Sequence, residues 1–300
     1  MRAVVIGGSG QIGGWLRHWL DERGHQTIGT YATVETPGCV PFDAADKEDA
    51  ASWLRACRPQ AVYYPAGFTW VDGCERDPAR AMDANRDQPL NLARVANDIG
   101  AKFVYFSTDY VFDGTDGPNS ESDAPNPLSV YGRSKLEAEQ TLQRELGELA
   151  LILRTTWVFG PERQGKNFAY QLARTLREGK TLACPSDQIS NPTYGSDIAL
   201  VAAVLTERGE SGVFHIAGPD RIARPAFAES LARGLGLDER LIVAKPTAEL
   251  GQGAPRPLNG GLKSERLDPM FAELMRPLSS TIPEFRDCGP PWRSPLSSGL

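Results

Sequence analysis

Histidine and cysteine are both scarce in this sequence. The 300 residues include 3 histidines and 5 cysteines, none of the cysteines stands in a C-x-x-C pair, and the histidines lie far apart. This usage predicts neither a disulfide framework nor a zinc site, so we expect no bound metal and free thiols. Free thiols are typical of reducing compartments, which makes the cytoplasm the expected location.

Long apolar runs and clusters of basic residues are also missing. The longest apolar stretch near a predicted helix, residues 199–205, is too short to cross a bilayer, and residues 2–6 resemble a strand rather than a signal peptide. The net charge of −6 is spread along the chain. Because nucleic-acid backbones are bound by concentrated Lys and Arg, we expect neither a nucleic acid nor a membrane as a partner.

Short strand-like runs alternate with helical stretches in the first half of the chain. The runs are rich in Val, Ile, Tyr, Phe or Leu and comprise residues 3–6, 27–31, 61–64, 103–106 and 149–153. The stretches with helical spacing comprise residues 11–23, 79–99 and 131–146. This alternation is typical of βαβ units and predicts an α/β fold with a Rossmann-type, doubly wound parallel sheet.

The second half of the chain differs in composition, because Pro- and Gly-rich loops separate its predicted helices and strands. Helices are expected at residues 167–178, 195–207 and 225–235, and strands at 181–183 and 213–217. We therefore expect a dinucleotide-binding domain over residues 1–158, to which later segments such as 194–217 return. Residues 159–287 would form mainly a small C-terminal substrate-binding lobe, and residues 288–300, rich in Pro, Ser and Gly, a weakly ordered tail.

A glycine-rich segment follows the first strand and opens the first helix. Its spacing is G-x-x-G-x-x-G. Glycine allows a tight turn and a close approach of backbone N–H groups to a pyrophosphate, whose charge is favoured at a helix N-terminus. The segment predicts a nicotinamide dinucleotide cofactor in contact with Gly7, Gly10, Gln11, Ile12 and Gly13.

The end of the second predicted strand bears on the choice of cofactor. Residues 29–32 contain no acidic side chain to bind the ribose hydroxyls of NADH, so NADPH is favoured and NADH remains the alternative. Asp43 follows shortly afterwards. It would either contact the adenine ring or cap a helix over residues 47–57.

Tyr131 and Lys135 form a Y-x-x-x-K pair at the start of a predicted helix. The spacing places the phenol and the ammonium one turn apart on one face. A neighbouring ammonium favours the phenolate, so we expect Lys135 to lower the pKa of Tyr131 and fit it for proton transfer. Thr108 directly follows the fourth strand run, at a crevice edge where it would hydrogen-bond a substrate carbonyl.

These motifs together resemble a known family. The segments with the resemblance are the glycine loop at residues 7–13, the S-T-D-Y-V-F-D-G block at 107–114 and the Y-G-R-S-K block at 131–135. They are similar to the extended short-chain dehydrogenases/reductases and, among these, to the dTDP-4-dehydrorhamnose reductase family, over about residues 1–270.

The resemblance implies transfer of hydride from NAD(P)H to C4 of a nucleotide-diphospho-4-keto-6-deoxyhexose, with dTDP-L-rhamnose synthesis as the leading case. It implies that Tyr131 donates the proton, Lys135 also holds the nicotinamide ribose, and Thr108 orients the ketone. It further implies that Ala66 and Gly67 lie beside the cofactor and that Asn85 supports the catalytic helix. Asp109 and Trp157 would border the sugar, and Asn167 and Gln188 would bind the substrate. Arg256 would contact the diphosphate or remain a surface arginine.

Two segments depart from the family pattern. Residues 63–68 contain a proline and bulky neighbours where small residues are usual, so Phe68 and Trp70 would reshape the sugar pocket. Residues 218–225 lack the usual Ser-Trp pair. The alternatives are a non-catalytic NADP-binding regulatory subunit similar to the β-subunit of methionine adenosyltransferase, and a reductase or epimerase of another nucleotide sugar. A homodimer is also left open.

Overall fold

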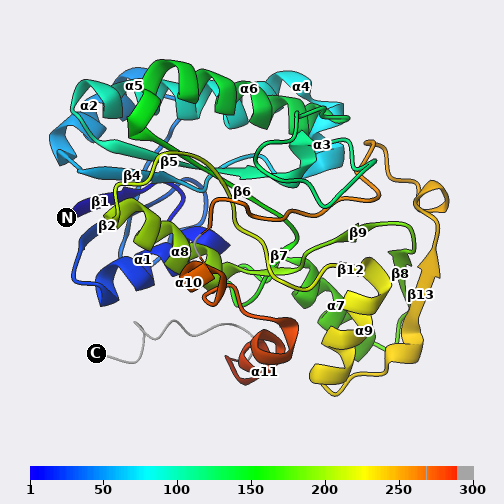
Figure 1. Ribbon diagram of the computed structural model, residues 1–300. Coiled ribbons are helices and arrows are strands. Elements are labelled where there is room, and N and C mark those ends of the chain that lie inside the picture. Colours follow the sequence, from blue (N-terminus) through cyan, green and yellow to red (C-terminus); the bar gives the residue numbers. More distant parts are fainter. Residues whose placement is uncertain (268, 289–300) are drawn as a thin grey trace.

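A seven-stranded parallel sheet forms the centre of the molecule. The computed structural model describes residues 1–267 and 269–288. The strand order is β11-β6-β5-β4-β1-β2-β3 (Figure 1). The strands are β1 (Arg2–Val5), β2 (Gln26–Tyr31), β3 (Cys39–Pro41), β4 (Ala61–Tyr64), β5 (Lys102–Thr108), β6 (Ala150–Thr155) and β11 (Gly212–His215). All neighbouring pairs are parallel, so the predicted doubly wound α/β fold is confirmed.

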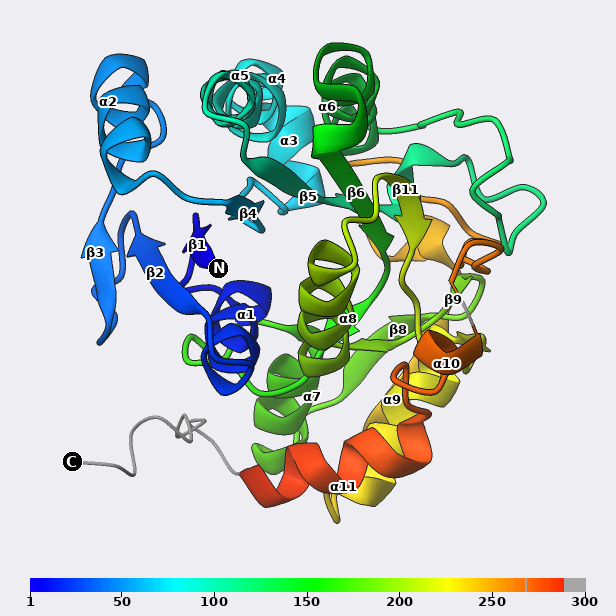
Figure 2. The same cartoon turned by 60° about the vertical axis from the view of Figure 1, so that its left-hand side comes forward.

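Helices cover both faces of this sheet (Figure 2). One face carries α1 (Gln11–Glu22) and α8 (Gly195–Glu207), and the other carries α2 (Lys47–Cys57), α5 (Gln88–Asp98) and α6 (Val130–Leu146). Side chains alternate along a strand, so Ala3 and Val5 join the core under α1 while Val4 and Ile6 join the core under α5. Burial on both faces explains why β4 is apolar at every position.

The predicted helix over residues 79–99 is divided in the structure. It consists of α4 (Pro78–Met82), a π-helical turn at Asp83–Asp87, and α5, and it is preceded by α3 (Val71–Arg76). Proline occupies the first turn of α4, where its missing N–H has no partner to lose, and Pro89 follows shortly after the π-helical turn. The irregular turn between them carries the buried Asn85.

The later part of the chain builds a group of small elements at the C-terminal edge of the sheet. These are β7 (Val158–Phe159), α7 (Phe168–Arg177), β8 (Leu182–Pro185), β9 (Ile189–Ser190), β10 (Thr193–Tyr194), β12 (Ile222–Ala223), α9 (Arg224–Gly234), β13 (Ile242–Lys245), α10 (Pro269–Ala272) and α11 (Leu278–Cys288). All of them except β9 and α10 contribute to an apolar cluster that includes the fully buried Phe227. Between them, α8 and β11 return to the main sheet, where α8 packs on α1.

No helix among residues 1–267 and 269–288 is long and apolar enough to cross a membrane. Of the predicted C-terminal tail at residues 288–300, all but the first residue lie outside the described part of the chain.

Candidate active site

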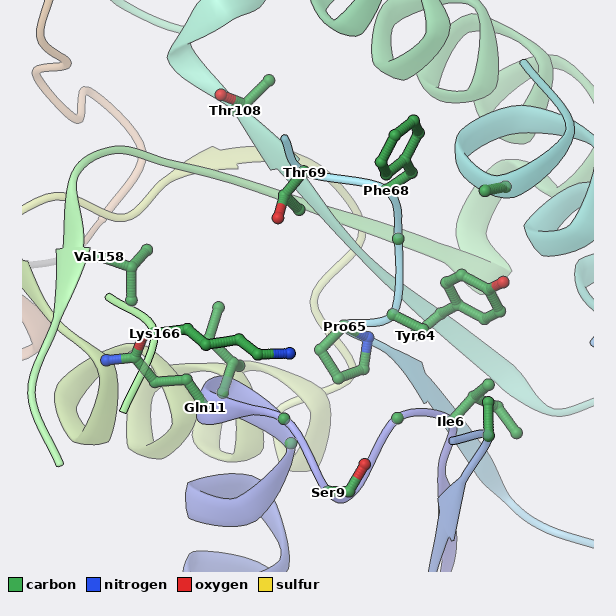
Figure 3. Close-up of a pocket in the computed structure, with 18 of the residues that line it drawn as sticks. Ile6, Ser9, Gln11, Tyr64, Pro65, Phe68, Thr69, Thr108, Val158 and Lys166 are labelled. Atoms are coloured by element: carbon green, nitrogen blue, oxygen red, sulfur yellow. The ribbon is translucent and has the colours of Figure 1, made fainter. Parts of the chain in front are cut away.

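A cavity of about 900 Å³ opens at the carboxyl ends of β1, β4, β5 and β6. Figure 3 shows the phosphate loop with Ser9 and Gln11 on one side of it and Phe68 and Thr108 on the other. Ligand crevices of doubly wound sheets lie at this edge, and the volume is near the upper end for small-molecule sites. The cavity is therefore large enough for a cofactor and a substrate together.

The glycine loop is shaped by close backbone contacts. Gly7 has a φ of 89°, a conformation that other residues rarely adopt. Its N–H donates to Thr30 Oγ1 at 3.0 Å, and its carbonyl accepts from the Gly10 N–H at 3.0 Å. A Cβ at Gly13 would collide with the same Gly7 carbonyl oxygen. Only glycine fits at positions 7 and 13 without displacing the loop.

The start of α1 is suited to an anion. Its N-cap residue, Gly10, supplies no side-chain cap, and no acidic residue stands in the first turn. By contrast, α2 is capped by Asp46, which accepts from Asp49 N, and has two acidic residues in its first turn. The free N–H groups and the helix dipole of α1 thus favour a pyrophosphate at this point.

The residues predicted to contact the cofactor surround the cavity, with one exception. Those that line it are Gly7, Gly10, Gln11, Ile12, Gly13, Asp43, Ala66, Gly67 and Tyr131. The exception is Lys135, which lies directly behind the lining. The uncapped helix, the glycine cradle and the cavity volume fit a nicotinamide dinucleotide.

Asp43 does not cap a helix. Asp46 caps α2, so the helix-cap interpretation of Asp43 was wrong. The Asp43 carboxylate accepts from the Ala45 N–H at 2.9 Å and faces the cavity. Beyond β2 the lining continues with Ala32 and Thr33, neither of which would repel a 2′-phosphate.

Tyr131 occupies the first turn of α6. Ser129 caps this helix by accepting from the Gly132 N–H at 3.1 Å, and the Tyr131 ring meets the Tyr110 ring edge to face at 5.6 Å. Burial raises the pKa of Tyr131 well above its ordinary value, and its interaction with the Thr108 hydroxyl offsets part of this rise. The phenol is therefore fully protonated at neutral pH.

Lys135 lies on the same buried face of α6, and its side chain contacts β5. Its ammonium donates to the Phe106 carbonyl at 2.8 Å and lies 4.5 Å from the centre of the Tyr105 ring. Burial lowers the pKa of Lys135 to about 8, against the opposing charge of Glu139. The net pKa of Tyr131 is raised and not lowered as predicted, because burial has the largest effect on the phenol.

Asn85 connects the cavity wall to the helix that carries Tyr131 and Lys135. Its side-chain oxygen accepts from the Phe68 N–H at 2.8 Å, and its amide donates to the Phe68 carbonyl at 3.0 Å and to Ser134 Oγ at 3.1 Å. The Tyr105 hydroxyl donates to the Asn85 carbonyl. Asn85 thus supports α6, as the resemblance implied.

Asp109 is a buried carboxylate at the end of β5. It accepts hydrogen bonds from Thr156 Oγ1 at 2.7 Å, Ser190 Oγ at 3.1 Å and Thr108 Oγ1 at 3.3 Å. Burial nevertheless raises its pKa. Asp109 therefore fixes the hydroxyl of Thr108, its neighbour in the cavity wall.

Trp157 and Asn167 line the outer part of the cavity. Trp157 has a φ of 37°, a strained value for a bulky residue. The amide of Asn167 donates to the Gly160 carbonyl at 2.8 Å, and its oxygen caps α7 by accepting from the Ala169 N–H. The side chain of Asn167 therefore shapes the loop before α7.

Gln188 and Arg256 are not among the residues that line this cavity. Gln188 donates to Thr247 Oγ1 and to Gln252 Oε1, both at 3.1 Å. Arg256 forms an ion pair with Asp72 at 3.0 Å. Their contacts tie the loop after β13 to the rest of the protein, and Arg256 remains close enough to Tyr110 to affect its pKa.

Three further side chains, for which no role was predicted, contribute to the cavity. The hydroxyls of Ser107 and Thr155 are buried in its wall, and neither has a hydrogen-bond partner within the described residues. Buried hydroxyls of this kind are suited to a ligand. Lys166 extends across the cavity toward Pro65 (Figure 3). The buried Glu162 holds its loop by accepting from the Lys166 and Asn167 N–H groups at 2.7 Å.

A dinucleotide on the glycine loop would extend along the ends of β4 and β5 toward the phenol of Tyr131. The fold and this cavity define the class of NAD(P)H-dependent oxidoreductases with a Rossmann-type, short-chain dehydrogenase architecture. Residues 1–287 match the family model described as the RmlD substrate binding domain, and the chain belongs to that family.

Curated relatives and solved structures agree with this assignment. The chain is 35% identical over 264 residues to a probable low-salt glycan biosynthesis reductase of Haloferax volcanii, covering 86% of this chain and 88% of the relative. It is 31% identical to the dTDP-4-dehydrorhamnose reductase of Escherichia coli, covering 91% of this chain and 92% of the relative.

A dTDP-4-dehydrorhamnose reductase from Clostridium acetobutylicum superposes with a TM-score of 0.86 at 28% identity, covering 96% of this chain and 99% of its own. The Bacillus anthracis enzyme, solved in complex with NADP, superposes with a TM-score of 0.83 at 25% identity, covering 95% and 98%.

Proposed function

We propose that this protein uses NADPH to reduce the 4-keto group of a nucleotide-diphospho-4-keto-6-deoxyhexose, with dTDP-4-dehydrorhamnose as the leading substrate. The observation that carries the proposal is the buried pair of Thr108 and Tyr131 at the edge of a cavity that begins at an uncapped helix N-terminus. Relatives named as dTDP-4-dehydrorhamnose reductases support the choice of sugar.

The bound cofactor would supply hydride to the carbonyl carbon. In our proposal, Thr108 turns its single hydroxyl hydrogen, which here points to Asp109, to the carbonyl oxygen and so fixes the direction of the carbonyl. Tyr131 then gives its proton to the oxygen as the alkoxide develops. Its raised pKa keeps the phenol protonated at neutral pH, which is the form that an acid catalyst requires.

Lys135 has a separate role in this mechanism. A Cβ at Gly67 would lie 3.5 Å from the Lys135 ammonium, so only the glycine backbone separates this charge from the cavity. We propose that the ammonium holds the nicotinamide ribose and stabilises the phenolate left after proton transfer. NADPH is the proposed cofactor because Ala32 and Thr33, which line the cavity just after β2, carry no negative charge to repel a 2′-phosphate.

The test measures NADPH consumption with dTDP-4-keto-6-deoxy-L-mannose for the wild type and for Tyr131→Phe. The substitution removes only the hydroxyl, so NADPH affinity should be retained while kcat falls by about 100-fold or more. GDP- and UDP-linked keto sugars form parallel arms. Turnover of only a GDP- or UDP-linked sugar would show that the substrate carries that nucleotide and not dTDP. Tight NADPH binding without any turnover would contradict the proposed activity.

A further inference from the structure

Arg224 is a half-buried arginine without a counter-charge. It begins α9 in the segment that lacks the Ser-Trp pair, and its guanidinium carbon lies 3.5 Å from the centre of the Trp157 ring and 4.9 Å from that of Phe168. Within residues 1–267 and 269–288, no acidic side chain lies in ion-pairing distance of this guanidinium. Burial lowers the pKa of Arg224 to about 10, which still leaves it charged at neutral pH.

Other arginines near the core are compensated. Arg154 pairs with Glu139 at 2.6 Å, and Arg256 pairs with Asp72 at 3.0 Å. A buried charge that lacks a partner is costly, and the five N–H donors of a guanidinium are matched to carboxylate and phosphate oxygens. The stacking of Arg224 on Trp157 satisfies none of these donors. The described residues supply no side-chain acceptor to this guanidinium, so its donors are available to a ligand.

The position of Arg224 connects it to the candidate active site. Trp157, on which it stacks, lines the cavity, and so does Tyr110. Burial raises the pKa of Tyr110, and the nearby positive charges of Arg256 and Arg224 oppose that rise. The Tyr110 ring in turn contacts the Tyr131 ring at 5.6 Å. The charge of Arg224 thus reaches the ring that neighbours the proposed proton donor.

We propose that Arg224, together with Arg256, binds the diphosphate attached to C1 of the substrate sugar. The inference rests on the proposed function, in which C4 of the same sugar meets Tyr131. A hexose ring separates C4 from C1, so the diphosphate would lie away from Tyr131, toward Trp157 in the cavity wall, behind which Arg224 stacks. Neither arginine lines the cavity itself, and the charges of both reach Tyr110. The planar guanidinium of Arg224, stacked on Trp157, would donate paired hydrogen bonds to the diphosphate oxygens.

The experiment measures binding of dTDP by titration calorimetry in the presence of NADP⁺, so that it needs no turnover. The variants are Arg224→Gln and Arg224→Lys, and the control is Arg233→Gln, which makes the same change at an exposed arginine of α9 that pairs with Glu239. We expect Arg224→Gln to weaken dTDP binding by about 10- to 100-fold, because hydrogen bonds to a charged group are lost. The dTDP affinity of Arg224→Lys should lie between those of the wild type and Arg224→Gln, and the control should bind dTDP as the wild type does.

The outcomes separate this inference from the proposed function. Unchanged dTDP affinity in both Arg224 variants would overturn the inference even if the enzyme reduces the keto sugar. The same holds if only the KM for the complete sugar nucleotide rises while dTDP affinity is unchanged, because Arg224 would then contact the sugar and not the diphosphate. Arg224-dependent dTDP binding in a protein that reduces no keto sugar would preserve the inference and overturn the function. Because Arg224→Lys keeps the positive charge, its dTDP affinity provides the test if Arg224→Gln does not fold.

Discussion

Replacing Lys135 by methionine should change how stability depends on pH. The substitution keeps an unbranched side chain in the same buried space and removes the ammonium. Burial lowers the pKa of Lys135 from 10.5 to about 8. Because one pKa unit corresponds to about 1.36 kcal/mol, the charged form costs the folded state about 3 kcal/mol.

The sign of the effect follows from proton binding. Below about pH 8 the amine is charged in both states, so the folded protein bears the full cost. Between about pH 8 and 10.5 the folded state has released the proton that the unfolded state still holds. The free energy of unfolding should therefore rise with pH by about 3 kcal/mol relative to a chain that lacks this charge.

The assay is urea unfolding of the wild type and Lys135→Met at a series of pH values from about 7 to 10, followed by circular dichroism. Loss of the bond to the Phe106 carbonyl adds a constant offset, so the difference in slope is the informative quantity. Lys180→Met is the matched control, because Lys180 is exposed, and its difference from the wild type should not rise over this range. Parallel curves for the wild type and Lys135→Met would refute the burial argument.

Two further substitutions test the phosphate loop and the buried ion pair. Gly13→Ala should raise the dissociation constant for NADPH by about 100-fold, because its Cβ would displace the Gly7 carbonyl and with it the helix N-terminus. Titration calorimetry measures this constant, and a wild-type value would contradict the prediction. Glu139→Gln should destabilise the protein by about 3–5 kcal/mol, because it leaves Arg154 charged and buried. The control is Glu145→Gln on the same helix, which breaks an exposed ion pair and should lower the free energy of unfolding by less than about 1 kcal/mol. Equal losses for the two variants in urea unfolding would refute the distinction between the buried and the exposed pair.

Elements with a strong hydrophobic pattern could be predicted from the sequence. The fully buried β4 and helix α8 lie at residues 61–64 and 195–207, as their apolar runs predicted. The edge strand β3 was missed because it has three residues, is largely exposed and ends in proline. The division of residues 79–99 was missed because a π-helical turn barely disturbs helical periodicity.

The site was predictable where its chemistry depends on local spacing. The glycine loop and the Tyr131–Lys135 pair each lie within a few residues of sequence. The structure places the loop and Tyr131 in the cavity wall and Lys135 behind it. Their electrostatics depend on tertiary burial, which no local pattern encodes. For this reason the direction of the Tyr131 pKa shift was mispredicted, and the unpartnered Arg224 gave no signal until Trp157 was found beneath it.

The fate of a deuterium placed at C4 of the nicotinamide in NADPH tests the proposed reaction most directly. After incubation with dTDP-4-keto-6-deoxy-L-mannose, mass spectrometry and NMR should find the label on C4 of the product sugar. Tyr131→Phe should slow this transfer by about 100-fold or more without moving the label to another carbon. Label on any other carbon, or transfer at the wild-type rate in Tyr131→Phe, would contradict the proposed roles of the cofactor and of Tyr131.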